Sequence, residues 1–375
     1  MDAVDVIVIG GGLVGSAIAY GLGRCGRRVT VLDGADDAFR AARGNFGLVW
    51  VQGKGAALPP YATWTRGSQT RWPALAAALR EETGIDVQLR QPGGFHLCFS
   101  DAQMQQRATM LQALCDELGG DYPFAMLGHA ELAAKLPGLG PRVVGASYSD
   151  MDGHVNPLKL LRALHAAAQR RGARFVAGQQ VDAIEPAAGG YTVRTQTGRF
   201  DAPRVVIAAG LGSRALAAQV GLNVPVRPNR GEVLIGERVA PFLDYPTTYI
   251  RQTEEGTIQI GDSHEDVGFD DGVRADVLAA IAQHAVHAFP LLAQMKLVRA
   301  WGALRVMSSD GFPVYQESER CPGVFAATCH SGVTLAAAHV LRVAPWIAGG
   351  AAPAGIEPFS GARFERAQPS LQPVH

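Results

Sequence analysis

The sequence contains very little lysine and carries no net charge. Only four of its 34 basic residues are lysine, which leaves 30 arginines, and the 34 basic residues are balanced by 34 acidic ones. The arginines are scattered along the chain rather than gathered in runs. Because proteins that bind nucleic acids depend on clustered positive charge to neutralise phosphates, this balance excludes nucleic acid as an expected partner.

Paired cysteines and long apolar runs are also missing. The five cysteines form no C-x-x-C pair and show no metal-ligand spacing, so we expect no metal site and a reducing compartment. No run of about 18 apolar residues could cross a bilayer, and the N-terminus enters a strand without the basic segment of a signal peptide. We therefore expect a cytoplasmic protein with no transmembrane segment, while peripheral association with the inner face of the membrane stays open.

The chain has the composition of a compact enzyme and is long for a single domain. It has 375 residues, of which 47% are hydrophobic and 18% charged, so two domains are expected. It shows no repeat, low-complexity tract or linker, which indicates a second domain inserted into the first. We expect one domain from residues 1–85, 147–225 and 300–375, and the other from residues 86–146 and 226–299.

The most informative stretch is a strand, a glycine turn, a helix and a second strand at the start of the chain. The strand from Val4 to Ile9 leads to Gly10-Gly11-Gly12-Leu13-Val14-Gly15, and the second strand ends at Asp33. Glycines at these spacings permit a tight turn, close approach of the backbone to a pyrophosphate, and close packing of helix on strand. The following helix N-terminus attracts phosphate. The pattern predicts a dinucleotide site, with the Asp33 carboxylate on a ribose, and both NAD and FAD use it.

Apolar periodicity and capping signals predict the remaining elements. Helices are expected over residues 58–83, 101–118, 130–136, 158–171, 273–289 and 333–347. Strands are expected within residues 87–99 and over 174–176, 180–184, 191–196, 204–210 and 297–304, with a mainly β region over 224–261.

Taken in order, the motifs resemble FAD-dependent amino-acid oxidoreductases of the D-amino-acid oxidase, glycine oxidase and sarcosine oxidase group, over nearly the whole chain. Besides the fingerprint and Asp33, the resemblance rests on Asp152-Gly153-His154-Val155-Asn156-Pro157, Val205 to Gly210, Pro228-Asn229-Arg230-Gly231-Glu232, Trp301-Gly302-Ala303-Leu304-Arg305 with Asp310-Gly311-Phe312-Pro313, and His330-Ser331-Gly332-Val333-Thr334. The loop from Arg43 to Leu48 is most similar to bacterial members that oxidise D-hydroxyproline, opines or glycine, some of which work as subunits of hetero-oligomers.

The resemblance implies an α/β fold, in which a Rossmann-like FAD-binding domain carries an inserted substrate domain with a mixed, mainly antiparallel β-sheet. It implies FAD, and the lack of a cysteine near Ala303, where covalently flavinylated members carry one, implies non-covalent binding. The residues expected to contact FAD are Gly10, Gly12, Leu13, Val14, Gly15, Asp33, Arg43, Asn45, Phe46, Gly47, Leu48, Val181, Ala209, Gly210, Gly302, His330, Ser331, Gly332, Val333 and Thr334.

The resemblance also implies how substrate is held. Arg305, which we expect to follow the strand 297–304, would clamp the substrate carboxylate with its guanidinium fork, and Tyr249 would reach the same carboxylate. The implied reaction is oxidation of a small amino or imino acid, with D-amino acids, D-hydroxyproline, glycine, sarcosine and opines as candidates. A hydride would pass from Cα to flavin N5 and leave an imine, so the flavin supplies the chemistry and no catalytic triad is needed.

Several alternatives stay open. A 2-hydroxy-acid oxidoreductase on the same scaffold would want a placed base, for which His154 or His330 is the candidate. The chain could instead be a flavin subunit that needs a partner protein, or a purely NAD-dependent dehydrogenase. A second nucleotide site at Gly210–Ala215 is disfavoured because no acid ends a following strand at the right distance. The substrate and the electron acceptor, oxygen or another, are undecided, since glycine oxidase-like chains can carry an extra arginine where this chain has Ser331.

Overall fold

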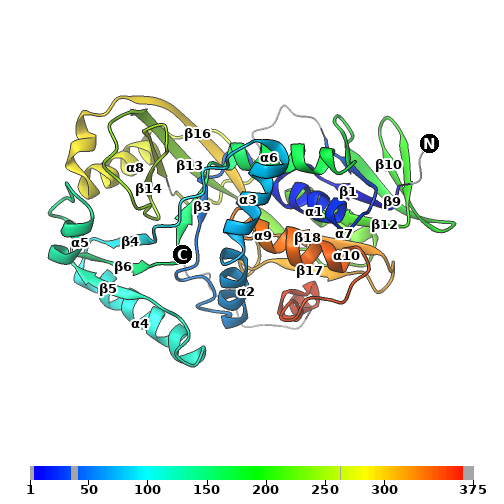
Figure 1. Ribbon diagram of the computed structural model, residues 1–375, viewed down its shortest axis with the longest axis horizontal. Coiled ribbons are helices and arrows are strands. Elements are labelled where there is room, and N and C mark those ends of the chain that lie inside the picture. Colours follow the sequence, from blue (N-terminus) through cyan, green and yellow to red (C-terminus); the bar gives the residue numbers. More distant parts are fainter. Residues whose placement is uncertain (1–3, 35–40, 262, 366–375) are drawn as a thin grey trace.

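The computed structural model describes residues 4–34, 41–261 and 263–365, and they form two bodies joined side by side (Figure 1). The body at the right of Figure 1 contains the N-terminal strand and the largest sheet, and the body at the left contains long antiparallel strands. The chain passes between them several times, because segments of the second body interrupt the first.

The first body is built on a six-stranded sheet. Its strands, in spatial order, are β17 (Val314–Glu317), β18 (Val324–Thr328), β12 (Arg204–Ile207), β1 (Val6–Ile9), β2 (Val29–Leu32) and β8 (Arg174–Val176). All neighbours are parallel except β17, which is antiparallel to β18. The central strands are runs of buried valine and isoleucine, as expected for a parallel sheet that is covered on both faces.

Helices cover one face of this sheet, and a small sheet with one helix covers the other. The helical layer contains α1 (Leu13–Arg24), α2 (Pro59–Gln69), α3 (Trp72–Thr83), α6 (Pro157–Arg170), α9 (Ala336–Ala338) and α10 (Ala344–Ile347). The opposite layer contains α7 (Ser213–Gln219) and the antiparallel strands β9 (Val181–Ala187), β10 (Gly190–Thr195) and β11 (Arg199–Ala202).

The second body contains two antiparallel sheets that meet edge to edge. One has the order β14 (Ile250–Gln252), β15 (Thr257–Gly261), β13 (Val226–Arg238) and β16 (Leu297–Ser308), and the other has β4 (Gly94–Cys98), β6 (Gly145–Ser149) and β5 (Ala125–Gly128). A bridge between Phe95 and Thr247 joins them. Residues of α5 (His129–Lys135) and α8 (Ala275–Ala288) share a core with alternate residues of these strands. The helix α4 (Asp101–Glu117) packs against Val51 and Ala62.

Between the bodies lies a short two-stranded pairing of β3 (Leu48–Val49) with β7 (Gly153–His154). It brings the loops around residues 45–54 and 152–156 together, although about a hundred residues separate them in sequence. Their meeting point is the junction at which the functional groups described below gather.

Several expected elements need correction. The helix expected over 58–83 is divided into α2 and α3, because Pro73 favours the start of a new helix. The helix expected over 333–347 begins only at Ala336 and contains a π-helical turn over His339–Val343, next to Pro345, which has no N–H to donate. Ahead of β4, the described chain at 87–93 makes only an isolated bridge at Arg90.

The α/β fold expected from the sequence is confirmed, with a mainly parallel sheet in one body and antiparallel sheets in the other. The domain boundaries stay a prediction. The strand β16 passes through position 300, so a boundary at that position falls inside a strand. Within the described ranges, no helix combines the length and apolar character needed to cross a membrane.

Candidate active site

The glycine turn after β1 is packed too closely for side chains at two positions. Gly10 has a φ of +107°, and a Cβ there would lie 2.4 Å from the carbonyl oxygen of Ala208. A Cβ on Gly15 would lie 1.9 Å from the carbonyl oxygen of Gly10. The turn is therefore held tightly at the carboxyl ends of β1 and β12, the edge at which parallel α/β sheets bind nucleotides.

The start of α1 adds phosphate-binding character to this turn. Gly12 caps the helix with extended backbone, and the first N–H groups of any α-helix have no partner within it. Asp33 follows β2, and a Cβ on Gly11 would lie 3.0 Å from its Oδ2 atom. A carboxylate therefore stands beside the positive end of a helix, which is the arrangement that the fingerprint predicts.

The loop before β3 reaches from this turn to the antiparallel sheet. Asn45 Oδ1 accepts a hydrogen bond from the Gly47 N–H at 2.7 Å, which holds the loop in a tight turn. The Phe46 carbonyl accepts from Arg251 Nε at 2.5 Å, and a Cβ on Gly261 would lie 3.1 Å from the Phe46 ring. Because Arg251 and Gly261 belong to β14 and β15, this loop connects the two bodies.

The turn after β18 is tied to the chain that follows β3. Ser331 Oγ accepts hydrogen bonds from Lys54 Nζ at 2.7 Å and from the Tyr61 hydroxyl at 2.9 Å. Thr334 Oγ1 accepts from the Trp50 N–H at 3.1 Å. Burial lowers the pKa of Lys54 to about 8, so its ammonium is still mostly protonated at neutral pH. A cation therefore lies one hydroxyl away from the Ser331 turn.

The structure brings most of the expected FAD contacts together. A Cβ on Gly332 would lie 3.6 Å from Leu13, so the turn after β18 meets the start of α1. Val181 follows Gln179, whose N–H donates to the Asp33 carbonyl at 2.7 Å. The residues at the sheet edge or its junction with the second body are Gly10, Gly12, Leu13, Val14, Gly15, Asp33, Arg43, Asn45, Phe46, Gly47, Leu48, Val181, Ala209, Gly210, His330, Ser331, Gly332, Val333 and Thr334.

Gly302 is the exception. A Cβ at this position would lie 2.3 Å from the carbonyl oxygen of Gly272 and 2.7 Å from that of Asp271. In β16 it is three residues from Arg305, so its Cα hydrogens point to the opposite face of the sheet. Its lack of a side chain is therefore explained by packing against the 271–272 loop, and the expectation that it contacts FAD finds no support in this geometry.

Arg305 lies within β16 rather than after the strand, because pairing with β13 continues as far as Ser308. Its NH1 group donates to the Ser263 carbonyl at 2.7 Å and to Asn229 Oδ1 at 3.2 Å. A Cβ on Gly231 would lie 2.4 Å from three atoms of the guanidinium group. The guanidinium group therefore lies across that glycine, and its orientation is fixed by the neighbouring strand.

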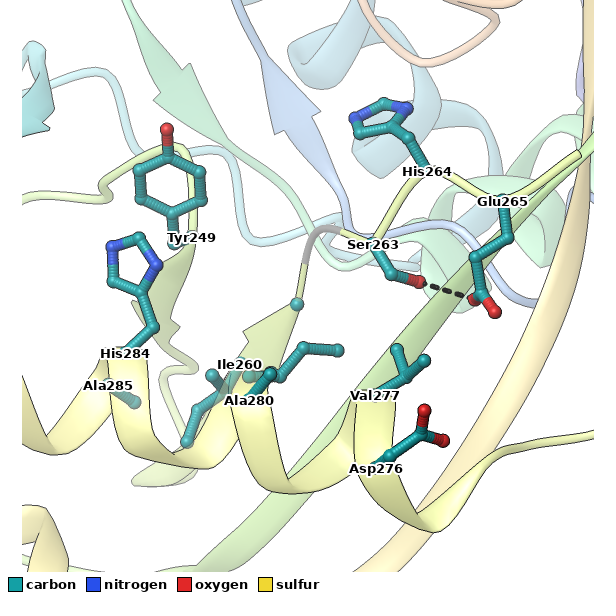
Figure 2. Close-up of a pocket in the computed structure, with 12 residues that line it drawn as sticks. Tyr249, Ile260, Ser263, His264, Glu265, Asp276, Val277, Ala280, His284 and Ala285 are labelled. Atoms are coloured by element: carbon teal, nitrogen blue, oxygen red, sulfur yellow. Dashed lines mark hydrogen bonds between the residues drawn. The ribbon is translucent and has the colours of Figure 1, made fainter. Parts of the chain in front are cut away.

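A cavity of about 400 Å³ shares a wall with Arg305. Its polar lining includes Tyr249, His264, His284 and Ser263, the residue whose carbonyl binds the Arg305 guanidinium (Figure 2). The Tyr249 and His284 rings lie beside each other with centroids 4.8 Å apart. The apolar lining comes from α8 and β15 and consists of Val277, Ala280, Ile281, Ala285 and Ile260. Size and lining match those of a small-molecule site.

Two other arginines near the sheet are engaged by protein groups. Arg230 is 1% exposed and pairs with Glu265 at 2.7 Å and with Asp270 at 2.6 Å. Arg251 is buried and lies 3.2 Å from His154 Nδ1 through its NH1 group. These contacts give both side chains structural roles and leave Arg305 as the arginine best placed beside the cavity.

A buried polar network behind the loop after β3 was not predicted from the sequence. The Asp152 carboxylate is fully buried and accepts hydrogen bonds from the Val51 N–H at 2.5 Å and from Gln52 Nε2 at 2.7 Å. Arg107 of α4 donates to Gln52 Oε1 at 3.1 Å and to Ser147 Oγ at 2.9 Å. The only signal in the sequence was an isolated polar residue, Gln52, that follows an apolar strand.

These features fit a dinucleotide that carries a flavin. The cradle formed by Gly10 and Gly15 has no room for side chains, the helix end favours the pyrophosphate, and Asp33 can accept from ribose hydroxyls. The Ser331 turn, beside a lysine, offers a positive environment to an electron-rich ring edge. Among the described residues, no group of three histidine, cysteine or carboxylate side chains is arranged to hold a metal ion.

Comparison with known proteins decides the family. Residues 5–344 match the model of the family described as "FAD dependent oxidoreductase". The chain belongs to this family. It is 42% identical over 369 residues to a subunit of opine oxidase from Agrobacterium tumefaciens, covering 98% of this chain and 100% of the relative. It is 28% identical to glycine oxidase of Geobacillus kaustophilus over 95% of this chain and 96% of the relative.

Solved structures support the same assignment. The crystal structure of glycine oxidase from Geobacillus kaustophilus superposes with a TM-score of 0.87 and 27% identity, covering 96% of this chain and 98% of that chain. The expectation of an FAD-dependent oxidoreductase of the D-amino-acid oxidase group is therefore confirmed, and a purely NAD-dependent dehydrogenase is excluded. Like these relatives, the protein acts on amino-acid-like substrates. Non-covalent attachment of FAD and the individual contact residues stay predictions.

Substitution of Asp33 by alanine is expected to weaken FAD binding by about tenfold or more, because hydrogen bonds to a charged acceptor contribute about 1.5–3 kcal/mol. The measurement is the dissociation constant of FAD, obtained by titrating the apoprotein and following flavin fluorescence. Asp182→Ala, which removes an exposed carboxylate in β9, is the control. An unchanged constant in Asp33→Ala would mean that the ribose is held elsewhere.

The buried Asp152 carboxylate predicts a pH-dependent stability. Burial raises its pKa from 3.8 to about 7, so the folded state binds a proton more tightly than the unfolded state between these values. Its contribution to stability is therefore complete below about pH 4 and falls as the pH rises to about 7, by at most about 4 kcal/mol. We expect the unfolding free energies of the wild type and Asp152→Asn, measured by urea denaturation, to change relative to each other over this range. A constant difference would contradict the assignment.

Proposed function

We propose that this protein uses FAD to oxidise N-substituted amino acids of the opine class at a Cα–H bond. Opines are secondary amines that carry two carboxylates, one from an amino acid and one from the group attached to its nitrogen. Support comes from the 42% identity to the opine oxidase subunit over the whole length of both chains. The observation that carries the proposal is the fixed Arg305 guanidinium beside a cavity of about 400 Å³.

The residues of this chain would bind and orient the substrate. Arg305 would hold one carboxylate bidentately, since a planar guanidinium matches carboxylate geometry. Tyr249 would donate its hydroxyl to the same carboxylate, and the apolar wall from α8 would accommodate the carbon skeleton. Bound FAD would accept the hydride. The protein's contribution is therefore to fix Cα against the cofactor and to keep the amine in its neutral form.

A hydroxy-acid substrate would need a base near the alcohol, and His154 does not suit that role. Burial, followed by the charges of Arg251 and Arg90, lowers the pKa of His154 to about 3. It lines a separate cavity of about 530 Å³ with Arg251, and neither Tyr249 nor Ser263 contributes to that cavity. His330 remains the candidate base for this alternative.

We further infer that the protein works with partner subunits. Support comes from two relatives that are themselves subunits, one of opine oxidase and the other hydrogen cyanide synthase subunit HcnC, the latter 27% identical and covering 96% of each chain. A partner would supply the route by which electrons leave the reduced protein. Co-purification of the chain with the products of neighbouring genes tests this inference, and a monomer that is fully active with oxygen would contradict it.

The proposed substrate class can be tested by anaerobic mixing of the purified flavoprotein with a panel of compounds. The panel contains iminodiacetate and N-(1-carboxyethyl) amino acids as secondary amines, glycine and D-alanine as primary amines, and lactate as a hydroxy acid. We expect the secondary amines with two carboxylates to reduce the flavin with the highest rate constant divided by dissociation constant. Faster reduction by lactate or by the primary amines would overturn the proposal.

A further inference from the structure

Arg107 is a largely enclosed cation that forms no ion pair with any described residue. Its hydrogen-bond partners are neutral: Nε donates to Ser147 Oγ at 2.9 Å and NH2 donates to Gln52 Oε1 at 3.1 Å. Burial lowers its pKa below the ordinary value. An enclosed charge without a counter-ion is costly, so this site favours an anionic ligand.

The nearest acid does not neutralise this charge. Asp152 is connected to Arg107 only through Gln52, whose Nε2 donates to Asp152 Oδ2 at 2.7 Å. Burial raises the pKa of Asp152 to about 7, so a large part of its population is protonated at neutral pH. By contrast, Arg230 contacts three carboxylates. Arg107 therefore differs from the arginines that only hold the fold together.

The guanidinium group of Arg107 lies against the loop after β3. A Cβ on Gly53 would lie 2.7 Å from its NH1 atom and 3.1 Å from its NH2 atom. That loop continues to Lys54, which donates to Ser331 in the turn assigned to the cofactor. Arg107 is therefore at the junction of the two bodies rather than on the outer surface of α4.

Arg107 is also connected to the substrate cavity. Its partner Ser147 lies opposite His96 in the pairing of β6 with β4, and the His96 ring lies 5.8 Å from the Tyr249 ring. Phe95 and Leu97, on either side of His96, belong to the core shared with α8. Since side chains alternate along a strand, His96 and Ser147 point away from that core, toward the side where Tyr249 and Arg107 interact electrostatically.

We propose that Arg107 binds the second carboxylate of a dicarboxylate substrate, the one carried by the substituent on the amine nitrogen. Arg305 and Arg107 would then hold the two ends of an opine, with the amine and its Cα between them. This inference rests on the proposed function and adds a residue that determines specificity for dicarboxylates over monocarboxylates. Ser147 and Gln52 act as positioning residues, because they fix the orientation of the Arg107 guanidinium.

The test uses two unreactive ligands that differ only in the second carboxylate. Diglycolate has two carboxylates on either side of an ether oxygen, and methoxyacetate has one. Their dissociation constants are measured from changes in the visible spectrum of the oxidised flavoprotein, so turnover is not required. In the wild type we expect diglycolate to bind about 10- to 100-fold more tightly, as charge-assisted hydrogen bonds imply. In Arg107→Gln this preference should nearly disappear, with methoxyacetate binding unchanged.

Two further variants make the result decisive. Arg66→Gln, the control, removes a guanidinium that pairs with Asp121 at the surface and should keep the preference. Arg107→Lys retains the charge without the planar fork, should lose part of the preference, and decides the question if Arg107→Gln does not retain FAD. Equal weakening of both ligands, or an unchanged preference in the Arg107 variants, would overturn the proposal. Failure of secondary amines to reduce the flavin while the preference persists would reject the proposed reaction and leave the Arg107 site standing.

Discussion

Arg305→Ala is expected to reduce the affinity for an amino-acid carboxylate by about 30- to 5,000-fold, which corresponds to a loss of about 2–5 kcal/mol for an enclosed charge pair. The reason is that the guanidinium is fixed by Ser263 and Asn229 beside the cavity, so little entropy is lost when it binds a ligand. The KM for iminodiacetate and the dissociation constant of methoxyacetate should rise together, because both ligands use this carboxylate site.

Arg305→Lys should not restore affinity, since an ammonium group cannot reproduce the planar fork. The flavin spectrum should be retained in both variants, because the residue is assigned to substrate and not to FAD. Arg227→Ala is a matched control on the neighbouring strand, where an exposed arginine pairs with Asp266. Wild-type KM values in Arg305→Ala would show that the carboxylate is held elsewhere.

Gly15→Ala is expected to yield a protein that does not retain FAD. The added Cβ would lie 1.9 Å from the Gly10 carbonyl oxygen and 3.2 Å from Val8 Cγ1, so α1 must move away from the turn. Such overpacking costs about 1–3 kcal/mol in stability. The movement also displaces the helix end that faces the pyrophosphate. The ratio of flavin absorbance to protein absorbance after gel filtration measures the effect.

Gly67→Ala is the matched control for this substitution. Gly67 also lies inside a helix, α2, but a Cβ there would only make ordinary contacts of 3.6 Å with arginine side chains. We expect this variant to retain FAD and to be about 0.5–1 kcal/mol more stable, because alanine has the higher helix propensity. Loss of FAD in both variants, or in neither, would contradict the packing argument.

Much of the nucleotide-binding end could be predicted from the sequence because its determinants are local. The strand Val6–Ile9, the glycines after it and the acid after the second strand are close together in the chain, and each has a defined mechanical role. The helices α4 and α6 were predicted almost to the residue, since Ser100 and Asn156 cap them with side-chain hydrogen bonds.

The rest depends on contacts between distant segments. The end of β16 is set by its pairing with β13, about 70 residues earlier, so the strand does not stop before Arg305 as periodicity suggested. Gly302 was assigned to the cofactor because it lies in a family motif, whereas its packing partner comes from the 271–272 loop. Arg107 could not be singled out among 30 arginines, because its lack of a counter-ion is a property of the folded chain.

The most direct test of the proposed function is anaerobic mixing of the purified wild-type chain, without added partner proteins, with increasing concentrations of iminodiacetate. We predict that the visible flavin absorbance disappears with a rate that saturates with substrate, and that one equivalent of substrate reduces one equivalent of flavin. We also predict that Arg305→Ala shows no saturation over the same range. A colourless protein, or a flavin that stays oxidised in excess substrate, would contradict the claim that this chain itself carries the FAD-dependent oxidation of a secondary amine.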